Sequence, residues 1–106
     1  MKKYLRLDVY VPSSHLEKLK EALFAAGAGK LGNYDRCCWQ TQGLGQFRPL
    51  TGSSPFLGDE MKLEVLEEYK LEILFPVELK QQLVTVLRET HPYEEPAFQI
   101  IEVSIS

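Results

Sequence analysis

Apolar and polar residues alternate near the start of the chain, where leucine or valine occupies every second position from Leu5 to Val11. This period of two predicts a half-buried strand over residues 4–11. Apolar residues then recur over residues 16–26 at the spacing of an amphipathic helix that packs one stripe against a sheet. Gly27 follows and is expected to end this helix.

The same two periods continue to the end of the chain. They predict strands over residues 35–42, 61–75 and 97–105 and a second helix over residues 76–90. The order strand, helix, strand, strand, helix, strand is the βαββαβ order of a ferredoxin-like α+β fold. We expect a four-stranded antiparallel sheet with two helices on one face. At 106 residues, of which 44% are hydrophobic, the chain is expected to be a single domain over residues 1–106.

One face of such a sheet has no helix to cover it. The alternation places Tyr4, Tyr10, Phe98 and Ile100 on that open face. Large apolar side chains on an exposed sheet predict that something else covers them. We therefore expect a homo-oligomer whose subunits associate through their sheets.

Charge and composition exclude several classes of partner. The formal net charge is −3 and the isoelectric point is near 5.4, whereas a nucleic-acid binder needs a clustered basic face, so no direct nucleic-acid partner is expected. No apolar run approaches the length of a membrane span, so no membrane partner is expected either. The only two cysteines are adjacent, unlike the disulfide framework of a small secreted domain, and we expect a cytoplasmic protein.

A stretch rich in glycine and proline over residues 43–60 interrupts the regular elements and predicts a loop or arm. Loops of this length in compact domains are often functional, so Gly43, Gly45, Phe47 and Arg48 are candidate ligand-binding residues. The arm could equally pack on another subunit, and the two roles are compatible. Its apolar anchors would then be Phe47, Leu50, Phe56 and Leu57.

A second candidate segment joins the second helix to the last strand over residues 91–98. Prolines on either side of Tyr93, Glu94 and Glu95 fix the backbone, so these side chains are held in place. Tyr93 is therefore added to the candidate ligand-binding residues. His91, Glu94 and Glu95 offer an imidazole and two carboxylates, which suit a divalent metal ion such as zinc, copper or manganese.

Those three residues do not complete a metal site. Cys38 or Asp35 of a neighbouring subunit could supply a further ligand. The structural alternative is that His91 caps the helix C-terminus and the glutamates pair with basic residues across an interface. Nucleophilic catalysis would need Cys37 or Cys38 beside His91, which nothing in the sequence demands, and no catalytic residue is predicted.

Residues 27–34 contain a literal G-x-G-x-x-G. In a dinucleotide-binding fold this motif follows a strand and opens a helix, so that the helix N-terminus meets the pyrophosphate. Here it follows a helix and leads into a strand. We interpret Gly27 as a helix C-cap and the following glycines as points of close backbone approach.

Three separated strings resemble, in the right order, the inserted middle domain of the Nif-three-like proteins, the NGG-one-interacting factor family. They run from Gly27 to Cys37, from Gly43 to Pro55 and from His91 to Ala97. The likeness covers nearly the whole chain, from Lys3 to Val103. The closing His-Pro-Tyr-Glu string is also similar to the end of the CutA divalent-cation-tolerance proteins, which share with the PII signalling proteins a ferredoxin-like fold assembled as trimers. The resemblance implies the same fold and a homotrimer.

The resemblance does not carry the family's hydrolase-type metal chemistry to this chain. In that family a flanking domain builds the two-metal centre from several histidines and carboxylates, whereas this chain has only His15 and His91. We therefore predict a small oligomeric binding or sensing module for a divalent metal ion or a small ligand, without catalytic activity. A protein-protein interaction or structural assembly module is the alternative, and a metal-dependent hydrolase is a more distant one.

Overall fold

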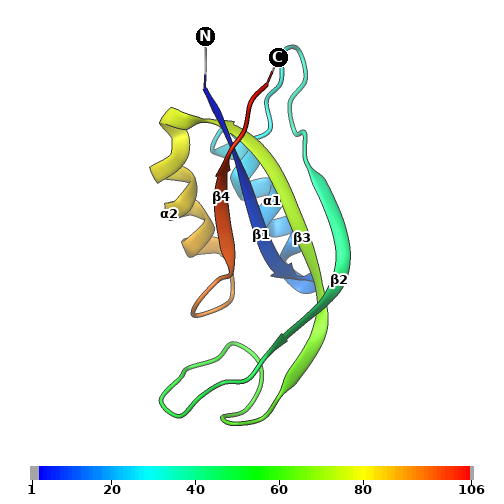
Figure 1. Cartoon of the computed structure of the whole chain (residues 1–106), viewed down its shortest axis with the longest axis vertical. Helices are drawn as coiled ribbons and strands as arrows, with labels where there is room; N and C mark the ends of the chain where they lie inside the picture. The colour runs from blue at the N-terminus through cyan, green and yellow to red at the C-terminus, as the bar shows by residue number, and fades with distance from the viewer. Residues whose placement is uncertain (1–2, 106) are drawn as a thin grey trace.

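The computed structural model describes residues 3–105, which form one sheet with two helices packed on the same face (Figure 1). The sheet has four strands in the order β2-β3-β1-β4, and every neighbouring pair is antiparallel. The predicted ferredoxin-like fold is therefore confirmed. The elements are β1 (Tyr4–Pro12), η1 (Ser13–His15), α1 (Leu16–Ala25), β2 (Trp39–Phe47), β3 (Glu64–Pro76), η2 (Val77–Leu79), α2 (Lys80–Thr90) and β4 (Phe98–Glu102).

The hydrophobic core lies between the sheet and the helices. Alternate residues of β1 and β3 point into it, and each helix contributes the apolar stripe that its periodicity predicts. Burying one large apolar side chain contributes about 1.5–3 kcal/mol, so this stripe fixes which face of the sheet the helices cover. The fully buried members include Leu7, Val9, Val11, Leu19, Leu23, Leu71, Ile73, Phe75, Leu83 and Leu87.

Strand β4 presents its side chains the opposite way from the sequence prediction. Phe98 and Ile100 pack against the core on the helix side, where the Arg88 guanidinium lies over the Phe98 ring at 5.2 Å. Their predicted place on the open face was wrong. The pairing register explains the error: Val9 lies opposite Phe98, and side chains directly opposite each other share a face, so a one-residue difference reverses the whole strand.

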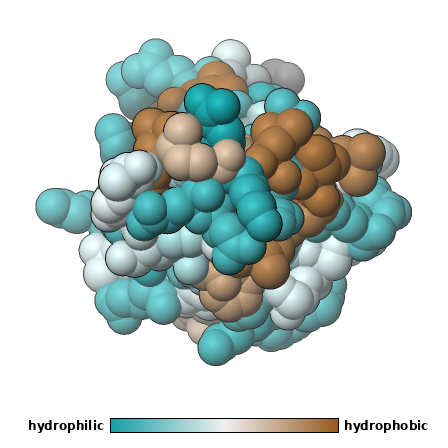
Figure 2. All heavy atoms as spheres, turned by 90° about the horizontal axis from the view of Figure 1, so that it is seen from below, coloured by the Kyte–Doolittle hydropathy of each residue, from teal (hydrophilic) through white to brown (hydrophobic). Residues whose placement is uncertain are grey.

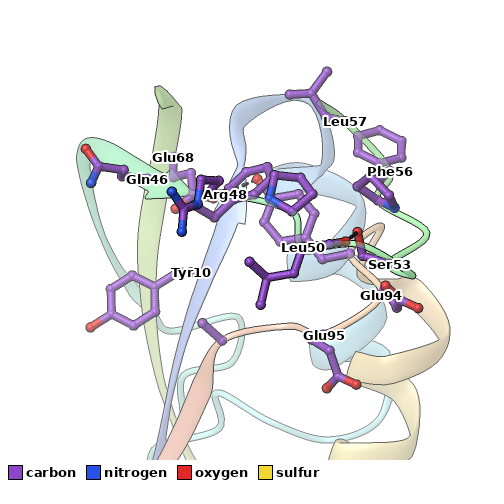
Figure 3. A pocket seen from close by; sticks show the side chains of 15 residues that line it. Tyr10, Gln46, Arg48, Leu50, Ser53, Phe56, Leu57, Glu68, Glu94 and Glu95 are labelled. Carbon is purple, nitrogen blue, oxygen red and sulfur yellow. Dashed lines mark hydrogen bonds between the residues drawn. The ribbon is translucent and has the colours of Figure 1, made fainter. Parts of the chain in front are cut away.

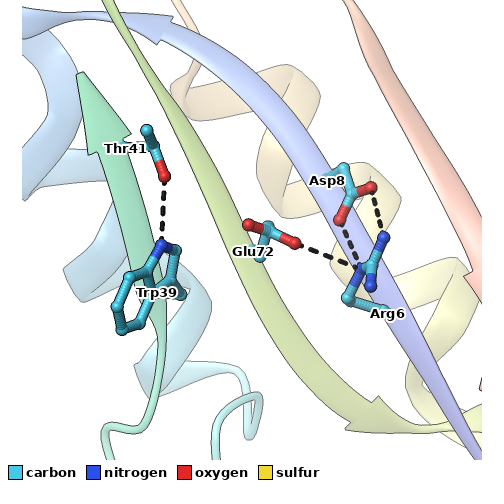
Figure 4. A network of polar contacts seen from close by, with 5 residues as sticks. All are labelled: Arg6, Asp8, Trp39, Thr41 and Glu72. Atoms are coloured by element: carbon cyan, nitrogen blue, oxygen red, sulfur yellow. Dashed lines mark hydrogen bonds and ion pairs between the residues drawn. The ribbon is translucent and has the colours of Figure 1, made fainter.

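A polar network occupies the middle of the open face (Figure 4). Asp8 is completely buried and accepts hydrogen bonds from Arg6 Nε at 2.8 Å and Arg6 Nη2 at 3.0 Å. Glu72 of β3 lies 3.6 Å from the same Arg6 Nε. Trp39, at the start of β2, donates its indole N–H to Thr41 and remains 67% exposed. The open face therefore combines a built ion pair with one large uncovered aromatic ring.

The hairpin of β2 and β3 projects beyond the rest of the sheet (Figure 1). Phe47 pairs with Glu64 at its far end, whereas β1 stops at Pro12, which pairs with Glu68. Strand β2 continues to Phe47, into the stretch predicted as irregular, and β3 begins at Glu64, later than the predicted residue 61, so the irregular segment runs over residues 48–63. We call this segment the arm.

Gly27 and Gly29 act as the sequence interpretation expected, whereas a Cβ on Gly32 would meet nothing within 4 Å. Gly27 has a positive φ of 107° and its amide bonds back to the carbonyl of Phe24, as at a helix C-cap. Gly29 approaches the backbone of Cys37 so closely that a Cβ would lie 2.7 Å from the Cys37 carbonyl oxygen. The Cys37 amide bonds to the Gly29 carbonyl at 2.9 Å, and β2 begins only at Trp39 and not at residue 35. Within residues 3–105, no helix is long and apolar enough to cross a membrane.

Candidate functional site

The arm folds back toward the connection between α2 and β4 and encloses a cavity with it (Figure 3). We call residues 91–97 of that connection the elbow. The cavity has a volume of about 400 Å³. Seen from this end, the surface carries apolar side chains next to hydrophilic ones (Figure 2). The lining residues are Tyr10, Gln46, Phe47, Arg48, Pro49, Leu50, Ser53, Pro55, Phe56, Leu57, Glu68, Tyr93, Glu94, Glu95 and Ala97.

Tyr93 is the centre of the site. Its hydroxyl donates to Glu68 Oε2 at 2.7 Å, and its ring lies 5.8 Å from the Phe47 ring and 6.4 Å from the Phe56 ring. The half-buried position and the Glu68 carboxylate both raise the pKa of Tyr93 above its usual range. The phenol therefore stays protonated and ties the elbow to β3.

Two further contacts hold the arm against neighbouring segments. The backbone N–H of Ser54 donates to Glu94 Oε1 at 3.0 Å. The Phe56 ring meets the His15 ring edge-on at 5.4 Å between centroids. These contacts, together with Tyr93, give the arm a defined position over the cavity.

His91 connects the elbow to β1. Its Nδ1 accepts the backbone N–H of Tyr93 at 3.1 Å, so its Nε2 must carry the proton that is donated to the Tyr10 carbonyl at 2.7 Å. The residue is only 5% exposed, and this burial lowers the pKa of the imidazole. His91 is thus a neutral bridge between the elbow and β1, and its side chain does not cap α2 as an imidazolium.

Gly45 makes room for the Glu68 side chain. A Cβ built on Gly45 would overlap the Glu68 carboxylate, whereas one on Gly43 would meet nothing within 4 Å. The two candidate glycines therefore differ in role. Gly45 shapes the site through Glu68, and Gly43 lies on the open part of β2 and does not line the cavity.

The charges of the lining are unbalanced. Glu68, Glu94 and Glu95 supply three carboxylates and Arg48 supplies one guanidinium. Among residues 3–105, none of these four groups has an oppositely charged side chain within 4.0 Å. The cavity therefore combines an apolar wall with an excess of uncompensated negative charge.

The structure brings together most of the predicted ligand-binding residues. Phe47, Arg48 and Tyr93 line one cavity, together with Glu94 and Glu95. Sequence reasoning missed Tyr10, Gln46 and Glu68. Glu68 reads as one more solvated glutamate of a charged strand, and only the pairing of β3 with β1 and β2 reveals that it faces the arm.

The four predicted metal ligands do not meet within one chain. Residues 3–105 contain no group of three or more histidine, cysteine, aspartate or glutamate side chains placed to hold a metal ion. Both ring nitrogens of His91 are engaged. Cys38 precedes the first residue of β2, whereas the arm follows the last, and a strand of 9 residues separates them. Burial also raises the pKa of the Cys38 thiol, which disfavours the thiolate that binds metal.

The fold is that of a class of small ferredoxin-like modules. CutA from Archaeoglobus fulgidus, a periplasmic divalent cation tolerance protein, superposes with a TM-score of 0.68 at 16% identity, over 97% of this chain and 86% of CutA. GlnK from Bacillus subtilis, solved as a complex with ATP, gives 0.62 at 14% identity, over 96% of this chain and 84% of GlnK. At these identities the likeness concerns the fold alone.

Sequence identity links the chain to one group of longer proteins, although no family model matches it. It is 40% identical over 98 residues to the GTP cyclohydrolase 1 type 2 homolog of Bacillus subtilis, covering 92% of this chain and 26% of that protein. The homolog from Mycobacterium tuberculosis is 39% identical over 92 residues, covering 87% of this chain and 24% of that protein. A Bacillus cereus protein related to NIF3 superposes with a TM-score of 0.83 at 32% identity, over 98% of this chain and 26% of its own.

The chain is thus a homologue of a domain-sized segment of the NIF3-related proteins, and its resemblance to the Nif-three-like, CutA and PII proteins is confirmed. It spans about a quarter of the length of the curated relatives that it matches.

Proposed function

We propose that this chain is a binding module for a small ligand and that the cavity between the arm and the elbow is its binding site. One observation carries the proposal. A cavity of about 400 Å³ has apolar walls and several polar groups that converge on it, which is the usual composition of a small-molecule site. The contacts of Tyr93 and Glu94 hold the lining in a defined arrangement, so binding would need little reorganisation.

The names of the relatives suggest other chemistry, but neither a reaction nor ATP binding is proposed for this chain. GTP cyclohydrolase 1 type 2 homologs are much longer proteins, of which this chain covers 26% or less among those compared above. GlnK was solved with ATP, but the three carboxylates of this cavity outnumber its single guanidinium and would repel a triphosphate. The proposal therefore assigns binding to this chain, without a reaction.

A divalent metal ion remains a second candidate ligand. Glu94 and Glu95 lie at the cavity with carboxylate oxygens that suit such an ion. Since one chain brings no three ligands together over residues 3–105, this proposal requires further ligands from another copy. We accordingly propose a homotrimer, as the resemblance to CutA and PII implies, located in the cytoplasm.

A protein-binding role is favoured by a different surface. Leu44 and Val65 on the projecting hairpin, and Leu63 at the end of the arm beside it, are each more than half exposed, and Leu44 reaches 79%. Exposed apolar side chains grouped on one projection are typical of a surface that contacts another chain. This role would use the hairpin and leave the cavity free for a small ligand.

Nuclear magnetic resonance tests the proposed site directly. Titrating small-molecule fragments into the labelled protein should shift the amide resonances of the arm and the elbow. Leu50→Arg should fill the cavity and abolish these shifts. Leu44→Arg, which places the same charge on an exposed leucine of the hairpin, should leave them unchanged. Shifts that gather on the hairpin, or that survive in Leu50→Arg, would contradict the proposal.

A further inference from the structure

The cavity carries negative charge that the chain does not neutralise. Glu68 accepts the Tyr93 hydroxyl and Glu94 accepts the Ser54 amide, but a neutral donor leaves the charge of a carboxylate in place. Within residues 3–105, the Glu95 carboxylate has no donor comparable to the Tyr93 hydroxyl on Glu68 or the Ser54 amide on Glu94. A ligand that brings positive charge would therefore be favoured over a neutral or anionic one.

Aromatic rings form part of the apolar lining, beside leucines and prolines. Tyr10, Phe47, Phe56 and Tyr93 all line the cavity, and Figure 3 places Tyr10 and Phe56 on opposite sides with Leu50 between them. The face of an aromatic ring carries partial negative charge and attracts a cation within about 6 Å of its centre. Aromatic rings and carboxylates in one cavity both attract a positively charged group. The rings can in addition bury apolar atoms attached to that group.

We propose that the cavity binds an organic ammonium group, a positively charged nitrogen carried on an apolar body. This inference rests on the proposed function, because it names the ligand class of the same site. A compact hydrated metal ion would gain little from the apolar walls, and a phosphate would meet three carboxylates. An alkylated or aryl-substituted ammonium makes use of the rings, the leucines and the carboxylates together.

Arg48 and Glu95 together allow a test of the charge of the ligand. Its guanidinium and the Glu95 carboxylate are both exposed, both line the cavity and both lack an ion-pair partner within residues 3–105. Replacing either with glutamine changes the charge of the cavity by one unit in opposite directions. An ammonium ligand should bind more weakly to Glu95→Gln and more tightly to Arg48→Gln, whereas an anionic ligand should show the reverse.

The experiment uses benzyltrimethylammonium as the cationic probe, with benzyl alcohol, benzoate and ATP as the neutral and anionic probes. Affinities are measured from amide shifts at low and high salt. We expect benzyltrimethylammonium to bind best, to lose about two- to fivefold in affinity in Glu95→Gln and in Phe56→Leu, and to gain a similar factor in Arg48→Gln. Glu89→Gln, an exposed position of α2 outside the cavity, is the matched control and should bind as the unchanged protein does.

The possible outcomes distinguish the ammonium inference from the more general proposal of a small-ligand site. Tighter binding of benzoate or ATP in the cavity, with the two glutamine variants acting in the reversed sense, would overturn the ammonium inference and leave a small-ligand site. Absence of any probe-dependent shift in the arm or the elbow at millimolar concentration would overturn both.

Discussion

The Tyr93 hydroxyl donates a hydrogen bond to Glu68 Oε2 at 2.7 Å, and this single contact connects the elbow to the middle of β3. The two residues are far apart in the sequence, yet Glu68 sits in the space left open by Gly45. The geometry of the cavity therefore depends on Tyr93, Glu68 and Gly45 acting together.

Removing the Tyr93 hydroxyl should destabilise the protein. In Tyr93→Phe the half-buried Glu68 carboxylate loses its donor, and we expect the free energy of unfolding to fall by about 1–2 kcal/mol. Urea unfolding followed by circular dichroism measures this change. Tyr34→Phe removes a hydroxyl from a side chain that is 75% exposed and should change stability by less than about 0.5 kcal/mol. Equal losses in the two variants would contradict the role given to Glu68.

A methyl group on Gly45 should displace Glu68 and disturb the site. We expect Gly45→Ala to cost about 1–3 kcal/mol of stability, because the added Cβ overlaps a carboxylate that Tyr93 already holds in place. Gly43→Ala is the matched control on the same strand, and it should be neutral or slightly stabilising because nothing lies within 4 Å of its Cβ. Thermal unfolding compares the two variants directly. A Gly45→Ala protein as stable as the Gly43→Ala protein would mean that Glu68 can move away at no cost.

Acid should weaken the fold through His91. Burial lowers the pKa of its imidazole in the folded chain, whereas the unfolded chain takes up a proton near the ordinary value of 6.5. Below that pH the unfolded state binds more protons, so stability is complete above about pH 6.5 and falls as the pH decreases toward the folded pKa. Glu68 and the Tyr10 carbonyl oppose the shift, and the nearby charge of His15 adds to it.

Unfolding free energies measured between pH 7.5 and pH 5 check this dependence. His91→Gln should be less stable at neutral pH, because it loses the bridge to Tyr10, but it should lose less stability on acidification. His15→Gln removes only the smallest contribution to the shift of the His91 pKa, so it should keep most of the slope of the unchanged protein. If the slope survived in His91→Gln and vanished in His15→Gln, His91 would not be the residue responsible for the pH dependence.

The ion pair on the open face should contribute measurably to stability. Asp8 is completely buried and accepts two hydrogen bonds from Arg6, so Asp8→Asn should cost about 1–3 kcal/mol, a range that allows for the partial exposure of Arg6. Glu72 lies farther from Arg6 and is more exposed, and Glu72→Gln should cost less than about 1 kcal/mol. Denaturant titration of both variants gives the comparison. An equal or larger loss in Glu72→Gln would show that the Asp8 pair is not the main interaction.

Periodicity was sufficient to predict the fold because β1, β3 and the two helices each have one clear apolar face. The leucines and valines of β1 and the stripes of α1 and α2 leave only one way to bury their side chains together. Strand β4 is different, since Phe98 and Ile101 both favour burial and lie on opposite faces. The register of β4 depends on which residue after the elbow first pairs with β1. The local sequence pattern does not determine that residue.

The candidate site was predicted in part for a related reason. Prolines and glycines mark the arm and the elbow, so Phe47, Arg48 and Tyr93 could be named from local composition alone. Glu68 and Tyr10 lie on regular strands, where their side chains read as ordinary surface residues. They join the site through long-range pairing, and sequence patterns of short range carry little information about such contacts.

Assembly through the open face should be visible as a native mass of three chains. Each chain has a mass of 12.1 kDa, and we expect light scattering to give three times that value at micromolar concentration. Trp39 is the large aromatic residue left exposed beside the Arg6 network, so Trp39→Arg should disrupt the assembly by placing an unpaired charge in the contact. Val77→Arg, at a partly exposed position on η2, is the matched control and should keep the native mass.

The same measurement tests whether a metal ion takes part. If ligands from two copies complete a site with Glu94 and Glu95, adding zinc should raise the melting temperature of the assembled protein, and a chelator should reverse the rise. The monomeric Trp39→Arg protein should not respond, because one chain brings no three ligands together within residues 3–105. A single-chain mass for the unchanged protein would contradict the trimer. A zinc response that persists in the monomer would contradict a shared metal site and place the ligands within one chain.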